Sequence, residues 1–129
     1  MTGRGRRILV ADDDRFLRKA VETMLVREGY TVVTAADGEE ALRAARTEKP
    51  DLILLDLIMP KMRGFEVLKA LKADPQIGLM PVIVLSNLGQ EQDVQEAIEG
   101  GALEYFIKAE LSLKDLARRV DEVLRSTGT

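Results

Sequence analysis

Short apolar runs alternate with longer amphipathic segments along the whole chain. The first, third and fourth runs are almost continuously Val, Ile and Leu, as expected for strands that are covered on both faces. The segments between the runs repeat apolar residues at helical spacing, which predicts one helix after each strand. The five predicted strands are 8–11, 31–35, 52–55, 82–85 and 105–107.

Local signals predict where several helices begin and end. Gly29 follows the first amphipathic segment and is expected to end that helix. Asp37, with Glu40 three residues later, has the pattern of a capping box at the start of the second helix. Ser112, with Asp115 three residues later, is expected to begin the last one. All four prolines fall between elements or at their edges, as proline geometry requires.

Strict alternation of strands and helices predicts an α/β fold, in which right-handed crossovers place helices on both faces of a parallel sheet. We expect a flavodoxin-like, doubly wound (βα)5 three-layer sandwich with a five-stranded sheet in the order 2-1-3-4-5. The 129 residues fit one domain, with a core of about 6–125. We expect no effector domain, and therefore a stand-alone single-domain protein.

Polar side chains that could take part in catalysis or binding follow four of the predicted strands. Asp12 and Asp13 end the first strand, Asp56 ends the third, Ser86 the fourth and Lys108 the fifth. Parallel strands bring these ends to one edge of the sheet, where the switch point lies between the first and third strands. Carboxylates gathered there repel one another and favour a hard cation such as Mg²⁺. Together with a hydroxyl and an ammonium, they suit phosphoryl transfer to a carboxylate.

Composition removes several other classes of chemistry. The chain has no Cys and no His, which excludes disulfides, thiol catalysis, imidazole bases and the usual zinc ligands. No apolar run approaches the roughly 20 residues that span a bilayer, and the basic start lacks the apolar core of a signal peptide. We therefore expect a cytoplasmic protein without membrane contact. The net charge of −3 argues against direct DNA binding.

Four segments, in this order and spacing, resemble the receiver domain of two-component response regulators. Residues 8–13 resemble its first-strand acidic pair, and 50–60 with 64–68 resemble its phosphoacceptor segment. Residues 81–86 are similar to its switch-hydroxyl strand, and 101–108 to its lysine segment. The resemblance covers about residues 6–125. It implies a phosphorylation-dependent signalling switch that is no enzyme beyond its own phosphoryl transfer and autodephosphorylation.

The resemblance implies a role for each residue of the acidic cluster. Asp56 is the expected phosphoacceptor. Mg²⁺, or Mn²⁺, is expected to bind Asp12, Asp13, Asp56 and the backbone carbonyl of Ile58. The expected phosphodonor is a phosphohistidine on a sensor histidine kinase or a phosphotransfer protein.

The resemblance also assigns the residues that respond to the phosphate. Ser86 and Lys108 are expected to hold it, and Ser86 and Tyr105 to act as the switch. The output is expected as a downstream protein contact through the face formed by the fourth helix, fifth strand and fifth helix, or as relay of the phosphate to another protein's His. The expected state is a monomer or a phosphorylation-dependent homodimer.

Several positions depart from the family pattern, among them Arg63, to which no role is assigned. Ala109 replaces a frequent Pro, so we expect a trans peptide bond there. Asn87 replaces a small residue and is expected to narrow access to the phosphate. Ile58 and Leu88 occupy the positions that flank the attacking water, and two apolar side chains there disfavour an ordered water. We therefore hypothesise a long-lived phosphate, its lifetime tuned by Ile58, Asn87 and Leu88.

Simpler interpretations compete with some of these assignments. Asp14 fits a helix N-cap better than a metal ligand, Tyr105 could be a half-buried strand residue, and Arg4, Arg6 and Arg7 fit a solvated lead-in. A haloacid-dehalogenase-like hydrolase with Asp12 as nucleophile and Asp14 as acid/base is a weaker alternative, because it leaves Asp56 unexplained. A phosphate-independent receiver-like scaffold is the other alternative, motivated by Asn87 and Ala109.

Overall fold

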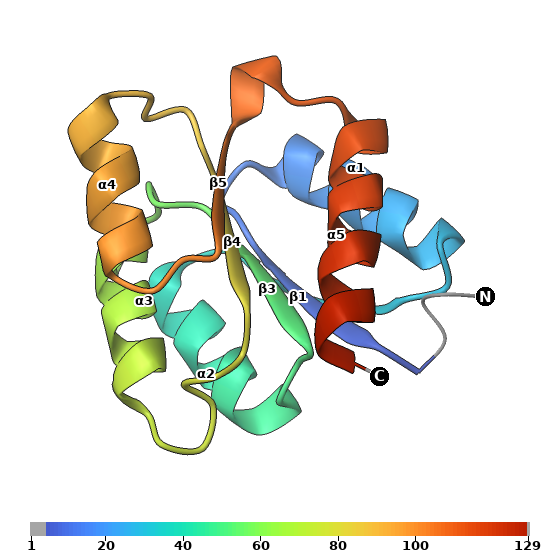
Figure 1. Ribbon diagram of the computed structural model, residues 1–129, viewed down its shortest axis with the longest axis horizontal. Coiled ribbons are helices and arrows are strands. Elements are labelled where there is room, and N and C mark those ends of the chain that lie inside the picture. The colour runs from blue at the N-terminus through green and yellow to red at the C-terminus, as the bar shows by residue number, and fades with distance from the viewer. Residues whose placement is uncertain (1–4, 129) are drawn as a thin grey trace.

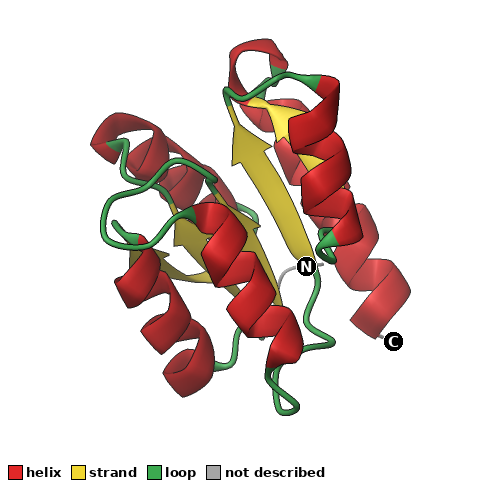
Figure 2. Cartoon of the chain, turned by 90° about the vertical axis from the view of Figure 1, so that its left-hand side faces the viewer, coloured by secondary structure: helices red, strands yellow, loops and turns green. Residues whose placement is uncertain are grey.

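The computed structural model describes residues 5–128, which form one parallel sheet between two layers of helices (Figures 1 and 2). The sheet has five strands in the order β2-β1-β3-β4-β5, which confirms the predicted fold class and order. Arg4 lies outside the described residues. The elements, in chain order, are β1 (Arg7–Ala11), α1 (Arg15–Arg27), β2 (Thr31–Ala35), α2 (Gly38–Glu48), β3 (Leu52–Leu55), α3 (Gly64–Ala73), β4 (Val82–Ser86), α4 (Glu91–Glu99), β5 (Glu104–Ile107), a 3₁₀ turn (Lys108–Glu110) and α5 (Leu113–Gly128).

Each face of the sheet has its own apolar core. Helices α2, α3 and α4 pack on one face and α1 and α5 on the other, as Figure 1 shows. Side chains alternate between the faces along each strand, so Leu9 joins the first core while Ile8 and Val10 join the second. Burial of both faces explains why the strands of the sheet centre read as continuous apolar runs.

The predicted helix caps are confirmed. Asp14 precedes α1, and its carboxylate accepts hydrogen bonds from the N–H groups of Phe16 and Leu17. Asp37 accepts from the N–H of Glu40 at 2.8 Å, while the Glu40 carboxylate accepts from the N–H of Ala36. The Ser112 hydroxyl oxygen accepts from Asp115 at 3.1 Å at the start of α5, and Gly29 follows α1 with φ of 98°.

The loop between β3 and α3 is anchored on the start of α2. The Gly38 N–H donates to the carbonyl of Pro60, and Lys61 forms an ion pair with Asp37 at 3.5 Å. A Cβ at Gly38 would lie only 2.0 Å from the carbonyl oxygen of Met62, so only glycine permits this approach. The loop that follows Asp56 is therefore held from the side by a neighbouring helix.

Within residues 5–128, no helix combines the length and the apolar character that a bilayer crossing requires.

Candidate functional site

The carboxylates of Asp12, Asp13 and Asp56 converge at the carboxyl edge of the sheet. Strands β1 and β3 pair in register up to Ala11 and Leu55, so the residues that follow them lie side by side. The N–H of Asp56 donates to the carbonyl of Ala11, which continues this pairing by one residue. Each of the three aspartates offers an oxygen that lies within 4.8 Å of those of the other two. The structure thus brings together the three acids predicted from the strand ends.

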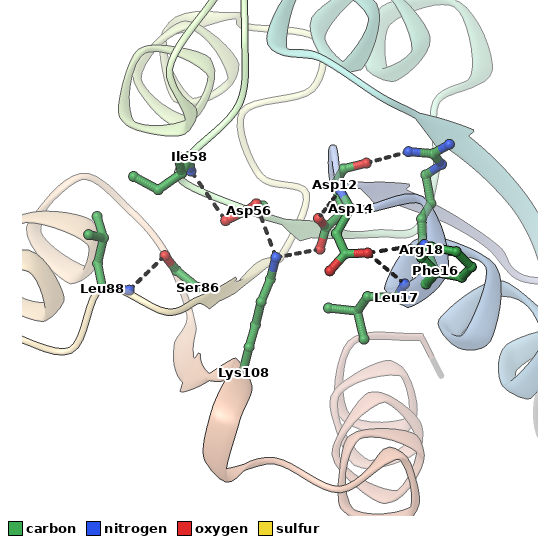
Figure 3. Close-up of polar contacts among 10 residues, drawn as sticks. All are labelled: Asp12, Asp14, Phe16, Leu17, Arg18, Asp56, Ile58, Ser86, Leu88 and Lys108. Atoms are coloured by element: carbon green, nitrogen blue, oxygen red, sulfur yellow. Dashed lines mark hydrogen bonds and ion pairs between the residues drawn. The ribbon is translucent and has the colours of Figure 1, made fainter.

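Lys108 lies between two of these acids (Figure 3). Its Nζ is 2.8 Å from Oδ2 of Asp12 and 3.1 Å from Oδ2 of Asp56. Both aspartates are only 3% exposed, so one ammonium compensates two buried carboxylates. Burial opposes the charged form of Lys108, but the hydrogen bond to Asp12 and the charges of both acids outweigh it and raise the pKa of Lys108.

The Asp56 carboxylate is held at both oxygens. Oδ1 accepts from the N–H of Ile58 at 3.2 Å, and Oδ2 accepts from Lys108. Burial raises the pKa of Asp56 to about 6; the Ile58 N–H and Lys108 oppose this rise, and the charge of Asp12 adds to it. Any further positive charge beside such a buried carboxylate would stabilise its ionised form.

The donor set fits a hard divalent cation. Three carboxylates face a single ammonium, so negative charge is in excess, and carboxylate oxygens are the ligands that Mg²⁺ and Mn²⁺ prefer. Asp14 does not join them, because its carboxylate caps α1. This geometry agrees with the N-cap interpretation of Asp14 and leaves the hydrolase alternative without its acid/base.

Ser86 and Tyr105 both contact the backbone of Leu88, in the loop after β4. The Ser86 side chain is fully buried, and its Oγ accepts from the Leu88 N–H at 3.2 Å. The Tyr105 hydroxyl donates to the Leu88 carbonyl at 2.5 Å, and burial raises the pKa of Tyr105. Tyr105 is half-buried, as the simpler interpretation expects, but its hydroxyl also joins β5 to this loop.

The positions that depart from the family pattern lie around the site. Ile58 is 51% exposed beside Asp56, whereas Leu88 is half-buried against the core. Asn87 is exposed. Ala109 lies in the 3₁₀ turn after Lys108, and the absence of cis peptide bonds from residues 5–128 confirms its trans bond.

The sequence analysis missed Arg18. Its Nη1 donates to the backbone carbonyl of Asp12 at 2.8 Å, so α1 reaches back to the end of β1 (Figure 3). The available signal was its position one helical turn after the Asp14 cap, on a side chain long enough to return to the strand end. That signal is weak, because an arginine on an amphipathic helix is usually solvated.

Comparison with known sequences identifies the family. Residues 8–121 match the model of the response regulator receiver domain. The chain is 43% identical over 122 residues to the probable transcriptional regulator ycf27 of Cyanophora paradoxa, covering 95% of this chain and 49% of the relative. It is 42% identical over 120 residues to the alkaline phosphatase synthesis transcriptional regulatory protein PhoP of Bacillus subtilis, covering 93% and 49%. The chain spans about half the length of these relatives.

Solved structures agree with the sequence comparison. The receiver domain of a Francisella response regulator superposes with a TM-score of 0.87 at 32% identity, covering 95% of this chain and 99% of that one. A chain of the CheX–CheY–BeF3–Mg²⁺ complex of Borrelia burgdorferi has a TM-score of 0.85 at 32% identity, covering 95% and 92%. The protein therefore belongs to the family of response regulator receiver domains, the phosphorylation-dependent switches of two-component signalling.

Proposed function

We propose that Asp56 accepts the phosphoryl group, from a phosphohistidine on a sensor histidine kinase or a phosphotransfer protein. The observation that carries the proposal is the environment of Asp56. It is a buried carboxylate at a strand end, with two acids and the Lys108 ammonium beside it. Asp13 is exposed, whereas Asp12 is as buried as Asp56. The choice of Asp56 over Asp12 rests on the family resemblance.

We propose that a divalent cation, Mg²⁺ or Mn²⁺, is held by Asp12, Asp13, Asp56 and the carbonyl of Ile58. When bound, it would neutralise phosphoryl oxygens and the charge of the acidic cluster. A related chain was solved in a complex whose name includes BeF3 and Mg²⁺, which supports this assignment. Of the four ligands, the Ile58 carbonyl rests on the family resemblance alone.

The chain's own residues perform the transfer. A carboxylate oxygen of Asp56 attacks phosphorus, the phosphorus–nitrogen bond to the donor imidazole breaks, and the imidazole keeps that electron pair and takes a proton from water. The Lys108 ammonium exchanges its contact with Asp56 for one with a negatively charged phosphoryl oxygen. Ser86, fully buried one strand away, accepts a hydrogen bond from the Leu88 N–H at present, so its hydroxyl can then donate a hydrogen bond to the phosphate.

We infer that the signal leaves through the face of α4, β5 and α5. A groove of about 510 Å³ lies on this face, lined by Val94 of α4, residues 104–107 of β5 and Arg118 and Arg119 of α5. Tyr105 lines it while its hydroxyl contacts Leu88, so one side chain connects the Ser86 loop to the groove. A downstream protein bound there would respond to the phosphate through Tyr105.

The proposal is tested by intact mass after incubation with acetyl phosphate and Mg²⁺. We expect the mass of one added phosphoryl group, its loss when a chelator removes Mg²⁺, and no addition to Asp56→Asn. Addition to Asp56→Asn at the wild-type level would overturn the assignment. Failure of the wild type to gain mass or to bind beryllofluoride with Mg²⁺ would favour the phosphate-independent scaffold, which no observation here supports.

A further inference from the structure

Asp13 is the least supported carboxylate of the acidic cluster. Asp12 accepts from the N–H of Asp14 at 2.9 Å and from Lys108, and Asp56 accepts from the N–H of Ile58 and from Lys108. The exposed Asp13 carboxylate, by contrast, forms no hydrogen bond or ion pair with any part of the chain from residue 5 to residue 128. Its direction is therefore set by its own backbone.

That backbone is held by Arg18. The guanidinium Nη1 donates to the carbonyl oxygen of Asp12 at 2.8 Å, and this oxygen belongs to the peptide unit that joins Asp12 to Asp13. Because a peptide unit is planar, a hydrogen bond to its oxygen restrains the rotation of the whole unit and so restricts the directions in which the Cα–Cβ bond of Asp13 can project. The other side of Asp12 is fixed as well, since its N–H donates to Ala35 of β2 at 3.0 Å.

Arg18 is itself well placed to act as a fixed support. It is half-buried on α1, and the start of α1 is capped by Asp14. The N–H of Arg18 also donates to the carbonyl of Asp14 at 2.9 Å. The loop of residues 12–14 is thus hydrogen-bonded both to β2 and to the first turns of α1, and Figure 3 shows the α1 side.

We propose that Arg18 is a positioning residue for the metal site, which holds the Asp12–Asp13 peptide so that the Asp13 carboxylate faces Asp12 and Asp56. The inference rests on the metal site of the proposed function and deepens it. Residues that orient metal ligands from behind commonly matter nearly as much as the ligands themselves.

Charge and positioning predict opposite effects when Arg18 is replaced. Loss of a cation near the cluster makes the local potential more negative, so by charge alone a divalent cation would bind more tightly. Loss of positioning would make it bind more weakly. Arg15 provides the matched control, because it is exposed on the same helix and its side chain forms no hydrogen bond within residues 5–128.

The experiment is Mg²⁺ titration by calorimetry of the full chain and of Arg18→Met, Arg15→Met and Asp13→Asn, with Mn²⁺ binding by electron paramagnetic resonance as a second readout. Methionine retains most of the apolar stem of arginine. Each variant is measured at a temperature at which circular dichroism shows it folded, and Arg18→Leu replaces Arg18→Met if that variant does not fold. We expect affinity about tenfold weaker for Arg18→Met, and unchanged or tighter binding for Arg15→Met.

A spectroscopic readout separates positioning from a general structural role. In carbon NMR, the chemical shift of the Asp13 carboxyl carbon should change on addition of Mg²⁺ to the wild type. It should change less in Arg18→Met at an equal Mg²⁺ concentration. Equal affinities of Arg18→Met and Arg15→Met would overturn the inference. If Asp13→Asn also binds like the wild type, the metal site itself is wrong; if Asp13→Asn alone is weakened, only the role of Arg18 fails.

Discussion

The side chain of Ile58 is half exposed next to the acceptor, and its N–H donates to Asp56. An apolar group at this place offers no hydrogen bond to a water that attacks the phosphorylated Asp56. We therefore predict that Ile58→Asn speeds loss of the phosphoryl group about tenfold, below the range for a full general base. The measurement is the decline of phosphorylated mass after the donor is removed.

Leu88→Glu should also speed this decay, but Leu88 packs against the core and its replacement is expected to lower stability as well. Ile58→Asn is the cleaner variant for this reason. Decay rates of both variants equal to that of the wild type would refute the hypothesis of a long-lived phosphate.

Before any cation binds, the Lys108 ammonium compensates the charge of the buried carboxylates. Its removal in Lys108→Met leaves the buried carboxylates of Asp12 and Asp56 uncompensated. We predict a loss of about 3 kcal/mol in the free energy of unfolding without Mg²⁺, measured by urea denaturation. Added Mg²⁺ should restore part of the loss, because it binds only the folded site.

The control is Lys114→Met, which removes an exposed lysine from α5. It should change stability little. Equal stabilities of the two lysine variants without Mg²⁺ would mean that Lys108 does not compensate the acids.

A residue's place in the site could be predicted from the sequence where the backbone alone determines its position. Asp12, Asp56 and Lys108 directly follow strands and Ser86 ends one, so the predicted sheet was enough to place them at one edge. The contact of Arg18 with the Asp12 carbonyl could not be predicted, because a long side chain on a helix surface has many directions and only the packed neighbours select one.

At the scale of elements, the start of α2 and the β3–α3 loop form one unit. A Cβ at Gly38 would lie 2.0 Å from the backbone oxygen of Met62, and backbone cannot move aside as a flexible side chain can. We predict that Gly38→Ala lowers the free energy of unfolding by about 3 kcal/mol and weakens Mg²⁺ binding, because the loop also carries Ile58.

Gly89→Ala is the matched control, since its added Cβ would meet only the end of the Ile107 side chain, at 3.1 Å. It should cost less than 1 kcal/mol, about the size of an ordinary loop substitution. If thermal or urea denaturation finds the two variants equally stable, the loop does not depend on its contact with α2.

Local chemistry predicted the ends of elements better than the contacts between them. Asp14, Asp37 and Ser112 were identified as caps because a cap needs only neighbours within four residues. Strand β5 begins one residue earlier than predicted, at Glu104, whose carboxylate pairs with Arg119 of α5. Contacts of this kind, like that between Gly38 and Met62, need the relative positions of whole elements and leave no local signal.

For the whole molecule, the two tyrosines report on alkaline stability. Burial, with the charges of Asp121 and Glu28, raises the pKa of Tyr30 to about 12, and burial raises the pKa of Tyr105. The unfolded chain ionises both near pH 10. Because the folded pKa values are the higher ones, their contribution to stability is complete below about pH 10 and is lost as pH rises toward the folded values.

We predict that the ultraviolet absorbance of tyrosinate rises at higher pH in the folded protein than in denaturant, with no contribution from Tyr30 near pH 10 while the protein is folded. The chain contains only these two tyrosines, so the signal has no other source. A complete transition near pH 10 in the folded protein would contradict the burial of the Tyr30 hydroxyl.

The order of the sheet was predictable because strictly alternating elements and right-handed crossovers leave few topologies. Continuous apolar strands such as 52–55 showed that both faces are covered. The output face of α4, β5 and α5 was expected only from the family resemblance, and its groove was not expected, since the lining comes from elements that are separate in the sequence.

The most direct test of the central claim is to locate the phosphoryl group within the chain. Borohydride converts an aspartyl phosphate into homoserine, which peptide mass spectrometry then assigns to one position. After phosphorylation with acetyl phosphate and Mg²⁺, the account predicts homoserine at position 56. Homoserine at position 12 or 13 instead would contradict it.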